Sequence, residues 1–389
     1  MKKTFGIAVV LLVCLVGGFL FLPSNYYLRK AIVHFMPKID QYPIFENRIV
    51  KAGSPQAWER AMKYNSLSLP PEFQPSFAEY ETVAFLIIKD NKLLFEEYWE
   101  DYSPKSYSNS FSMAKSIVSL AIGCAIDDGL IKTVDQPVSD FFPEFKEYNE
   151  KALTIRHLLT MSAGVDFEEA YTSPFSPTTK LYYGNNLQKI TFGMKKIEEP
   201  GVNFIYQSGV TQLLAFIVEK ATGKTLSDYV SDKLWTPMHA EESALWSLDR
   251  KDGIEKAYCC FNSNARDFAR FGQLLLNNGQ WDGKQLISPG YLKEALSPDV
   301  DLWDKENETP NRCYGFQFWY LNYKGLDVSY MRGILGQYVL AIPDKNAVIV
   351  RLGKKRSETR TSQHYPDDID IWLAAGLEII KRADLQESN

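Results

Sequence analysis

Ser112 and Lys115 lie three residues apart, and their types are those of a nucleophile and its base. On a helix, side chains at this spacing project from one face about one turn apart. A serine hydroxyl becomes a nucleophile when a neighbouring base takes its proton, and a neutral lysine amine can be that base. No other serine in the chain has a lysine three residues later. The pair therefore indicates nucleophilic catalysis without histidine.

The segment that carries this pair predicts a buried helix. From 112 to 126 nearly every residue is apolar or small, and Gly129 follows as a C-terminal cap. Burial disfavours the charged form of Lys115 and so favours the base. At the start of the helix, the Ser112 backbone N–H is placed to act as an oxyanion donor. The alternative interpretation is a serine near an N-cap, followed by a structural lysine that reaches water.

Other chemistries find little support in the sequence. The chain has no G-x-S-x-G, H-E-x-x-H or P-loop motif, and we interpret its four histidines as structural. The adjacent pair Cys259-Cys260 is neither a redox nor a zinc pattern, and Cys124 is expected to be a core residue. A net charge of −5 offers no basic face for nucleic acid. We therefore expect no metal, no cofactor and no nucleic-acid partner.

The N-terminus has the pattern of a membrane anchor. Lys2 and Lys3 precede an uncharged run from 4 to 22, which as a helix spans roughly 28 Å, close to the thickness of a bilayer core. The basic start predicts that the remainder lies outside the cytoplasm, in the periplasm or at the cell surface. The alternative is a signal peptide that is cleaved, which would release a secreted protein.

Alternating and helical hydrophobic patterns predict the order of elements. We expect a strand at 82–89, a turn at Asp90-Asn91 and a returning strand at 92–99, followed by the helix of Ser112. Further helices are predicted at 154–160, 209–222, 226–234, 265–277 and 367–383. Further strands are predicted at 314–321, 326–332, 337–342 and 347–352.

This order predicts an α/β (α+β) fold, with an antiparallel sheet flanked by helices and a mostly helical second lobe. Residues 1–23 would be the anchor or signal, and 24–79 a linker and N-terminal segment, with ordered β-structure beginning only at Thr82. The catalytic domain would cover 80–385. Its sheet lobe would comprise about 80–130 and 301–385, and its helical lobe about 131–300, with Ser112 opening between the lobes.

Three motifs in order resemble those of serine β-lactamases and penicillin-binding proteins. They are Ser112-Met-Ala-Lys115, then Tyr206-Gln207-Ser208, then the segment from Met331 to Gln337. The supporting segments 154–164, 200–206, 265–272, 314–319 and 338–344 are similar to the class C branch and its esterase relatives. Within that branch, the chain most resembles the hydrolases of 6-aminohexanoate oligomers and related carboxylesterases.

The resemblance implies a serine β-lactamase-like fold and an acyl-enzyme mechanism on a small-molecule substrate. Ser112 would be the nucleophile, with Lys115 and Tyr206 sharing the proton transfers. The predicted substrate-binding residues are Ser208, Gly333, Ile334, Tyr171, Tyr182 and Tyr183. Of these, Ile334 would give the second oxyanion N–H, and the three tyrosines lie on the segment with which the family roofs its cleft.

Two departures from the family pattern affect the expected substrate. Met331 stands where the family has a lysine or histidine, and Ser208 where it usually has asparagine. Because Arg332 should point away from the face shared by Met331 and Gly333, we expect an apolar cleft wall there. This favours small esters or linear amides over β-lactams. The alternatives are a non-hydrolytic sensor or scaffold, and a β-lactamase or D,D-peptidase.

Overall fold

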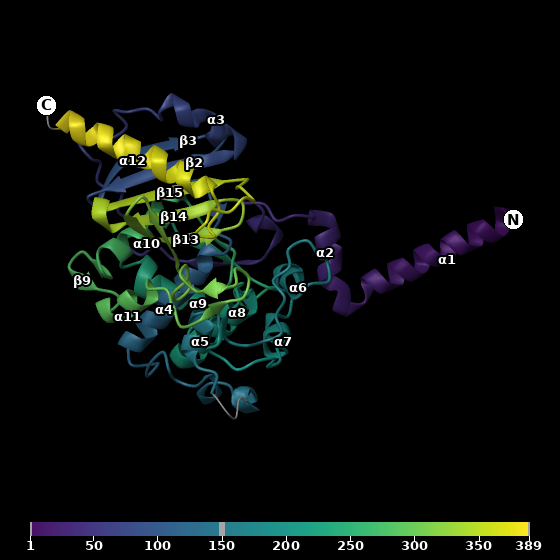
Figure 1. Cartoon of the computed structure of the whole chain (residues 1–389). Helices are drawn as coiled ribbons and strands as arrows, with labels where there is room; N and C mark the ends of the chain where they lie inside the picture. The colour runs from purple at the N-terminus through teal and green to yellow at the C-terminus, as the bar shows by residue number, and fades with distance from the viewer. Residues whose placement is uncertain (1, 148–151, 388–389) are drawn as a thin grey trace.

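The computed structural model describes residues 2–147 and 152–387. Its central element is a six-stranded sheet in the order β12-β13-β14-β15-β2-β3, in which every neighbouring pair is antiparallel (Figure 1). The strands are β2 (Thr82–Lys89), β3 (Lys92–Tyr98), β12 (Trp319–Tyr323), β13 (Leu326–Gly333), β14 (Gln337–Ile342) and β15 (Ala347–Gly353). The antiparallel sheet predicted from the sequence is confirmed.

Helices cover both faces of this sheet. Gly272 of α10 (Ala265–Leu276) lies against Val348 of β15, and Gly376 of α12 (Asp368–Glu387) lies against Ile349 of the same strand. Since neighbouring residues of a strand point to opposite faces, α10 and α12 lie on opposite sides of the sheet. The sequence predicts α10 in the helical lobe of about 131–300, but α10 packs on strands β14, β15 and β2 of the large sheet.

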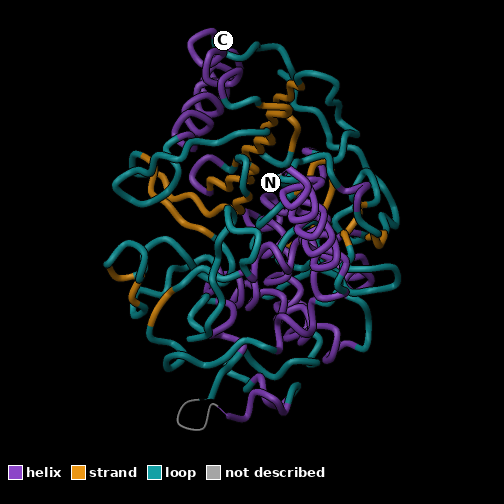
Figure 2. Tube along the Cα trace, turned by 90° about the vertical axis from the view of Figure 1, so that its right-hand side faces the viewer, coloured by secondary structure: helices purple, strands orange, loops and turns teal. Residues whose placement is uncertain are grey.

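The other helices form the second half of the molecule, with α4 (Met113–Asp127) at its centre. Figure 2 shows the strands of the large sheet in the upper half and most helices in the lower half. Here α4 packs against α8, and α5, α6 and α7 also contact α8. The bounds are α5 (Ile155–Leu159), α6 (Pro177–Tyr183), α7 (Leu187–Phe192), α8 (Ser208–Thr222), α9 (Leu226–Val230) and α11 (Pro289–Ala295), with a π-helical turn at Ser231–Trp235.

The expectation that ordered β-structure begins at Thr82 is wrong. β1 (Asn47–Val50) pairs with β6 (Ala244–Ser247) in a sheet of order β1-β6-β7-β4, almost 200 residues away in the chain. The remaining short strands are β4 (Ser108–Asn109), β5 (Asn203–Phe204), β7 (Phe261–Ser263), β8 (Gln280–Trp281), β9 (Lys284–Gln285), β10 (Trp303–Asp304) and β11 (Thr309–Pro310). Part of 24–79, the predicted linker and N-terminal segment, is therefore built into the body.

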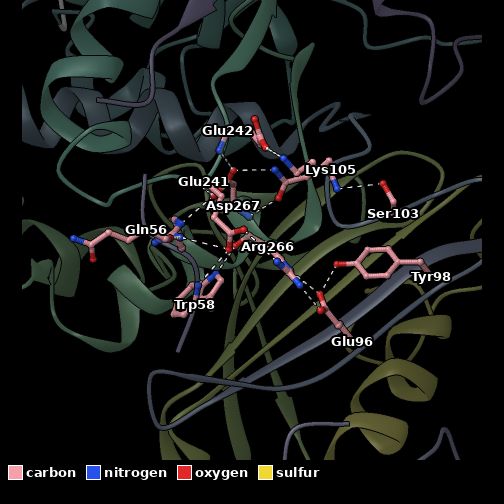
Figure 3. A network of polar contacts seen from close by, with 12 residues as sticks. Gln56, Trp58, Glu96, Tyr98, Ser103, Lys105, Glu241, Glu242, Arg266 and Asp267 are labelled. Atoms are coloured by element: carbon pink, nitrogen blue, oxygen red, sulfur yellow. Dashed lines mark hydrogen bonds and ion pairs between the residues drawn. The ribbon is translucent and has the colours of Figure 1, made fainter. Parts of the chain in front are cut away.

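A network of ion pairs fixes this N-terminal segment and α10 to the large sheet (Figure 3). Arg266 at the start of α10 donates from Nε to Glu96 of β3 at 2.8 Å, and Glu96 also accepts the Tyr98 hydroxyl at 2.7 Å. The indole N–H of Trp58 donates to the Arg266 carbonyl at 2.9 Å. Burial by itself would raise the pKa of the Glu96 carboxyl, but the hydrogen bond and ion pair with Arg266 hold it below its usual value. A charge that is paired in this way is compatible with burial.

The two N-terminal helices project from one side of the body (Figure 1). Apolar side chains of α1 (Lys2–Phe21) such as Phe5 and Leu15 are exposed, whereas α2 (Tyr26–His34) packs on α6. Among the described residues, no single helix has the length and apolarity of a membrane span. The segments Phe5–Phe21 and Pro23–His34 meet that description only as a pair, with a bend of 80° between them.

One predicted strand differs in its bounds. The segment 314–321 was expected to be extended throughout, but β12 begins only at Trp319. Tyr314 forms an isolated bridge with Trp319, and Gln317 between them has a φ of 63°. The chain therefore turns back on itself before the strand starts. Gln317 is buried and its side-chain amide bonds to the carbonyls of residues in α5, which fixes this turn.

Candidate active site

Ser112 lies at the N-terminus of α4, directly after a residue with strained backbone. Phe111 has a φ of 44°, and its N–H donates to the Asn109 side-chain oxygen at 2.8 Å. A left-handed conformation in a bulky residue costs on the order of 1–3 kcal/mol, and such residues are enriched at functional sites. The turn leaves Ser112 at the mouth of two cavities, while residues 113–125 of α4 are buried.

Lys115 is fully buried, and its amine is surrounded by three oxygen atoms. Nζ lies 3.1 Å from Ser112 Oγ, 3.1 Å from Ser208 Oγ and 3.0 Å from the Tyr258 carbonyl. A neutral amine that donates to Ser208 and to the carbonyl directs its lone pair at Ser112. This geometry fits a base that takes the proton of the serine hydroxyl.

Glu169, which was not identified from the sequence, extends this arrangement. Its carboxylate accepts the Ser208 hydroxyl at 2.6 Å, the Ser208 backbone N–H at 2.7 Å and the Tyr171 hydroxyl at 2.7 Å. It also lies at the positive end of α8, where a carboxylate is stabilised. Although Tyr171 is 42% exposed as a whole, desolvation of its hydroxyl and the adjacent Glu169 carboxylate raise its pKa above the ordinary value. The chain of contacts runs from Tyr171 through Glu169 and Ser208 to Lys115.

Tyr206 contacts Lys115 through the face of its ring. The amine lies 4.9 Å from the ring centroid, which is a favourable cation–π distance when the amine is charged. Trp319 at 5.5 Å and Tyr314 at 5.9 Å pack on the other sides of the ring. Tyr206 is thus fixed beside the amine that would exchange protons with Ser112.

The end of β13 lies against the backbone that precedes Ser112. A Cβ atom on Gly333 would be 2.2 Å from the Ser110 carbonyl oxygen, so only glycine permits this approach. Ile334 comes next and lines both cavities with Ser112. In the described part of the chain, neither the Ser112 nor the Ile334 backbone N–H donates a hydrogen bond. Both donors remain free for an oxyanion.

Two cavities meet at Ser112. The apolar pocket, of about 430 Å³, is lined by parts of 31–37 and 171–183 and by Tyr258. The charged pocket, of about 530 Å³, is lined by Glu169, Tyr206, Gly333, and acidic and basic side chains of 304–306, 332, 356 and 360.

All nine predicted site residues lie in this region. Ser112, Tyr171, Tyr182, Tyr183, Ser208 and Ile334 line the apolar pocket, Tyr206 and Gly333 line the charged pocket, and Lys115 bonds to Ser112 beneath them. Their catalytic and binding roles stay predictions.

The expected apolar wall at Met331 is wrong. Met331 is fully buried, whereas Arg332 lines the charged pocket with its guanidinium 3.5 Å from the Trp319 ring centroid. The alternation of β13 was predicted correctly, but the face that meets the pocket is that of Arg332. A cation therefore does border the cleft.

Two further features lie at the edge of the site. Cys259 and Cys260 form a disulfide between adjacent residues, which the sequence did not indicate, and Cys259 lines the apolar pocket. Within 2–147 and 152–387, no group of three or more histidine, cysteine, aspartate or glutamate residues is arranged to hold a metal ion.

Comparison with known proteins agrees with this geometry. Residues 74–370, which are well over half of the chain, match the family model described as Beta-lactamase. The chain belongs to the β-lactamase family. With this family and with hydrolases among its relatives, the chain is a serine hydrolase. A curated relative, the 6-aminohexanoate-dimer hydrolase of Paenarthrobacter ureafaciens, is 27% identical over 296 residues, which cover 72% of this chain and 75% of the relative.

Solved structures of the β-lactamase family share the fold. A candidate 6-aminohexanoate-dimer hydrolase from Bacillus anthracis superposes with a TM-score of 0.74 at 22% identity, covering 92% of this chain and 95% of the other. A family VIII carboxylesterase superposes with a TM-score of 0.61 at 16% identity, covering 83% and 99%. At these identities the likeness concerns the fold.

The role of Glu169 in catalysis can be tested by substitution. Replacing it by glutamine (Glu169→Gln) should lower kcat about 10- to 100-fold, because Ser208 loses a charged acceptor of its hydroxyl. The rate is measured with a chromogenic ester.

The matched control is Glu168→Gln, which removes a neighbouring carboxylate from the same pocket. The side chain of Glu168 makes no hydrogen bond within the described ranges, so its loss should change kcat less than about threefold. Equal effects of the two substitutions on kcat would show that only the total charge of the pocket matters, and would contradict a specific role of Glu169.

Proposed function

We propose that the protein hydrolyses an ester or a linear amide through an acyl-enzyme on Ser112. The observation that carries this proposal is the 3.1 Å contact between Lys115 Nζ and Ser112 Oγ where two cavities meet. Two of the proteins that the chain resembles, the 6-aminohexanoate-dimer hydrolase and the family VIII carboxylesterase, support this substrate class.

In the first half-reaction, Ser112 Oγ attacks the substrate carbonyl carbon while its proton passes to Lys115. The tetrahedral oxyanion lies between the backbone N–H groups of Ser112 and Ile334. Lys115 and Tyr206 share the transferred proton, and Tyr206, whose ring lies 4.9 Å from the amine, delivers it to the leaving alcohol or amine. The carbon–oxygen or carbon–nitrogen bond then breaks and the acyl group stays on Ser112.

In the second half-reaction, a water molecule takes the place of the leaving group. The Lys115–Tyr206 pair accepts a proton from it, and the resulting hydroxide attacks the acyl carbonyl. Collapse of the second oxyanion releases the carboxylic acid and returns the proton to Ser112 Oγ. The polar contact from Glu169 through Ser208 keeps the Lys115 amine in position during both steps.

The experiment that tests this function combines labelling and turnover. A fluorophosphonate should label Ser112 stoichiometrically, and p-nitrophenyl butyrate should be turned over. Labelling without turnover would favour the sensor or scaffold, for which the departures at Ser208 and Met331 leave room. A higher kcat/KM for a chromogenic β-lactam than for the butyrate ester would favour the β-lactamase alternative, with Arg332 as the partner of the β-lactam carboxylate.

We further propose that α1 anchors the protein, with the catalytic domain outside the cytoplasm. The exposed apolar side chains of α1 and its separation from the body support this (Figure 1). After cell fractionation, the full-length chain should stay in the membrane through salt and carbonate washes, whereas a chain that begins at Ser24 should be released. A shortened natural protein in the medium or periplasm would instead identify 1–23 as a cleaved signal.

A further inference from the structure

The apolar pocket has the size and lining of a site for a hydrocarbon chain. Its volume of about 430 Å³ falls within the roughly 300–1,000 Å³ of pockets that hold small ligands. Phe111, Tyr182, Tyr183 and Ile334 give it a mainly apolar surface, and Ser112 lies in its wall. A chain in this pocket would therefore place its carbonyl end at the nucleophile.

One wall of this pocket comes from the helix next to the proposed anchor. Ala31, Ile32, Phe35 and Met36 at the end of α2 line it. The Tyr183 hydroxyl on α6 donates to the Phe35 carbonyl at 3.3 Å, which ties the end of α2 to the opposite wall. The pocket is complete only with this N-terminal segment in place.

Large apolar side chains are exposed where the pocket opens. Ile32 is 63% exposed, Phe35 79% and Met36 45%, and Phe175, next to the pocket residue Pro174, is 61% exposed. Single exposed apolar residues are ordinary on a protein surface, but a group of them beside a cavity marks a contact with an apolar partner. Here Ile32 lies on α2, Phe35 and Met36 follow directly after it, and Phe175 precedes α6.

The angle between the two helices brings this opening to the bilayer surface. α1 and the segment of α2 are bent by 80°. If α1 stands along the membrane normal, α2 lies nearly in the membrane plane, as amphipathic interfacial helices do. The exposed residues of α2 then meet the region of the headgroups and upper acyl chains.

We propose that the apolar pocket binds the long acyl chain of a membrane lipid, which enters past the end of α2 and is cleaved at its ester bond. This rests on the proposed function. Ser112 Oγ bonds to the acyl carbonyl carbon as the bond to the ester oxygen of the lipid breaks. The Ser112 proton passes to that oxygen, so that the rest of the lipid leaves as an alcohol on the side of the charged pocket. Water then adds OH to the acyl carbon and returns its other proton to Ser112 Oγ, and a fatty acid is released.

The first arm of the test measures kcat/KM of the full-length protein, in detergent, for p-nitrophenyl esters from acetate to dodecanoate, each below its solubility limit. Each added methylene buried in the pocket should raise kcat/KM about two- to fourfold until the pocket is filled. A value that is flat or falls from acetate onward would overturn the proposal.

The second arm narrows the pocket. Ala31→Trp places an indole in its wall and should lower the dodecanoate-to-acetate ratio of kcat/KM at least about tenfold. The matched control is Val33→Trp, on the same helix but not in the pocket wall, which should leave this ratio within about twofold of the natural protein. Equal ratios in the two variants would contradict the proposal.

The third arm tests whether the bound acyl chain comes from a membrane lipid or from a soluble acyl compound. Vesicles of phosphatidylethanolamine and phosphatidylglycerol should release fatty acid with the full-length protein and not with Ser112→Ala. Hydrolysis of the soluble dodecanoate ester without release from vesicles would assign the pocket to soluble acyl compounds and overturn the membrane source. Turnover of acetate alone would overturn the acyl-chain site and leave the proposed function standing, whereas no labelling and no turnover of any ester would overturn both.

Discussion

Ser112→Ala is expected to lower kcat/KM for p-nitrophenyl butyrate by at least about 10³-fold in a protein that remains folded. The substitution removes the atom that carries the acyl group, and nothing else in the site can replace it. Its structural cost should be small, because Ser112 lies at a helix start beside two cavities and Lys115 keeps its contacts with Ser208 and the Tyr258 carbonyl. Steady-state kinetics and thermal unfolding measure the two effects.

Ser119→Ala is the matched control for this prediction. Ser119 lies two turns later on α4, where its hydroxyl contacts the Tyr291 hydroxyl at 3.0 Å. Its loss should lower the stability by about 1 kcal/mol and leave kcat/KM within about threefold. A Ser112→Ala protein that keeps near-native esterase rates would show that another residue is the nucleophile.

Lys115→Arg is expected to be as inactive as Lys115→Ala. A guanidinium stays protonated throughout the working pH range of an enzyme, so it cannot accept the proton of Ser112. Deleting the side chain removes the base and leaves Ser208 and the Tyr258 carbonyl without their donor. Both variants should lose at least about 10³-fold in kcat, measured with the butyrate ester.

Lys256, a second buried lysine, provides a control. Its substitution shows whether the loss of any buried amine has the same effect on kcat as the loss of the proposed base, Lys115. Burial lowers the pKa of Lys256 to about 7, and its amine donates to two carbonyls at the C-terminal end of α6. Lys256→Met should reduce stability, with kcat for the folded protein within about threefold. An active Lys115→Arg enzyme would mean that Lys115 is only a structural donor.

Local patterns predicted those elements whose residues are close in the chain. The Asp90-Asn91 turn has φ values of 50° and 60°, as a two-residue hairpin requires, and β2 has the predicted bounds. α8 ends at Thr222, as the predicted range 209–222 has it, and Gly223 after it has a φ of 67°, a left-handed cap that glycine favours. In each case the deciding interactions lie within a few residues.

Contacts between distant segments could not be predicted in this way. β1 was missed because its partner β6 is almost 200 residues away and its own four residues carry no strong pattern. Glu169 was missed because it lies in an irregular segment and its partner Ser208 comes 39 residues later in the chain. The orientation of Arg332 follows from which face of β13 meets the cavities, and alternation alone does not determine that face.

The central claim is that the acyl group of the substrate is carried by Ser112, and mass spectrometry of the enzyme during turnover tests it most directly. The full-length protein is mixed with excess p-nitrophenyl butyrate, quenched with acid within one turnover, digested and mapped. We predict one butyryl group per molecule, located on Ser112, which disappears once the substrate is exhausted. A butyryl group on another residue, or turnover with no acylated peptide at any quench time, would contradict the account.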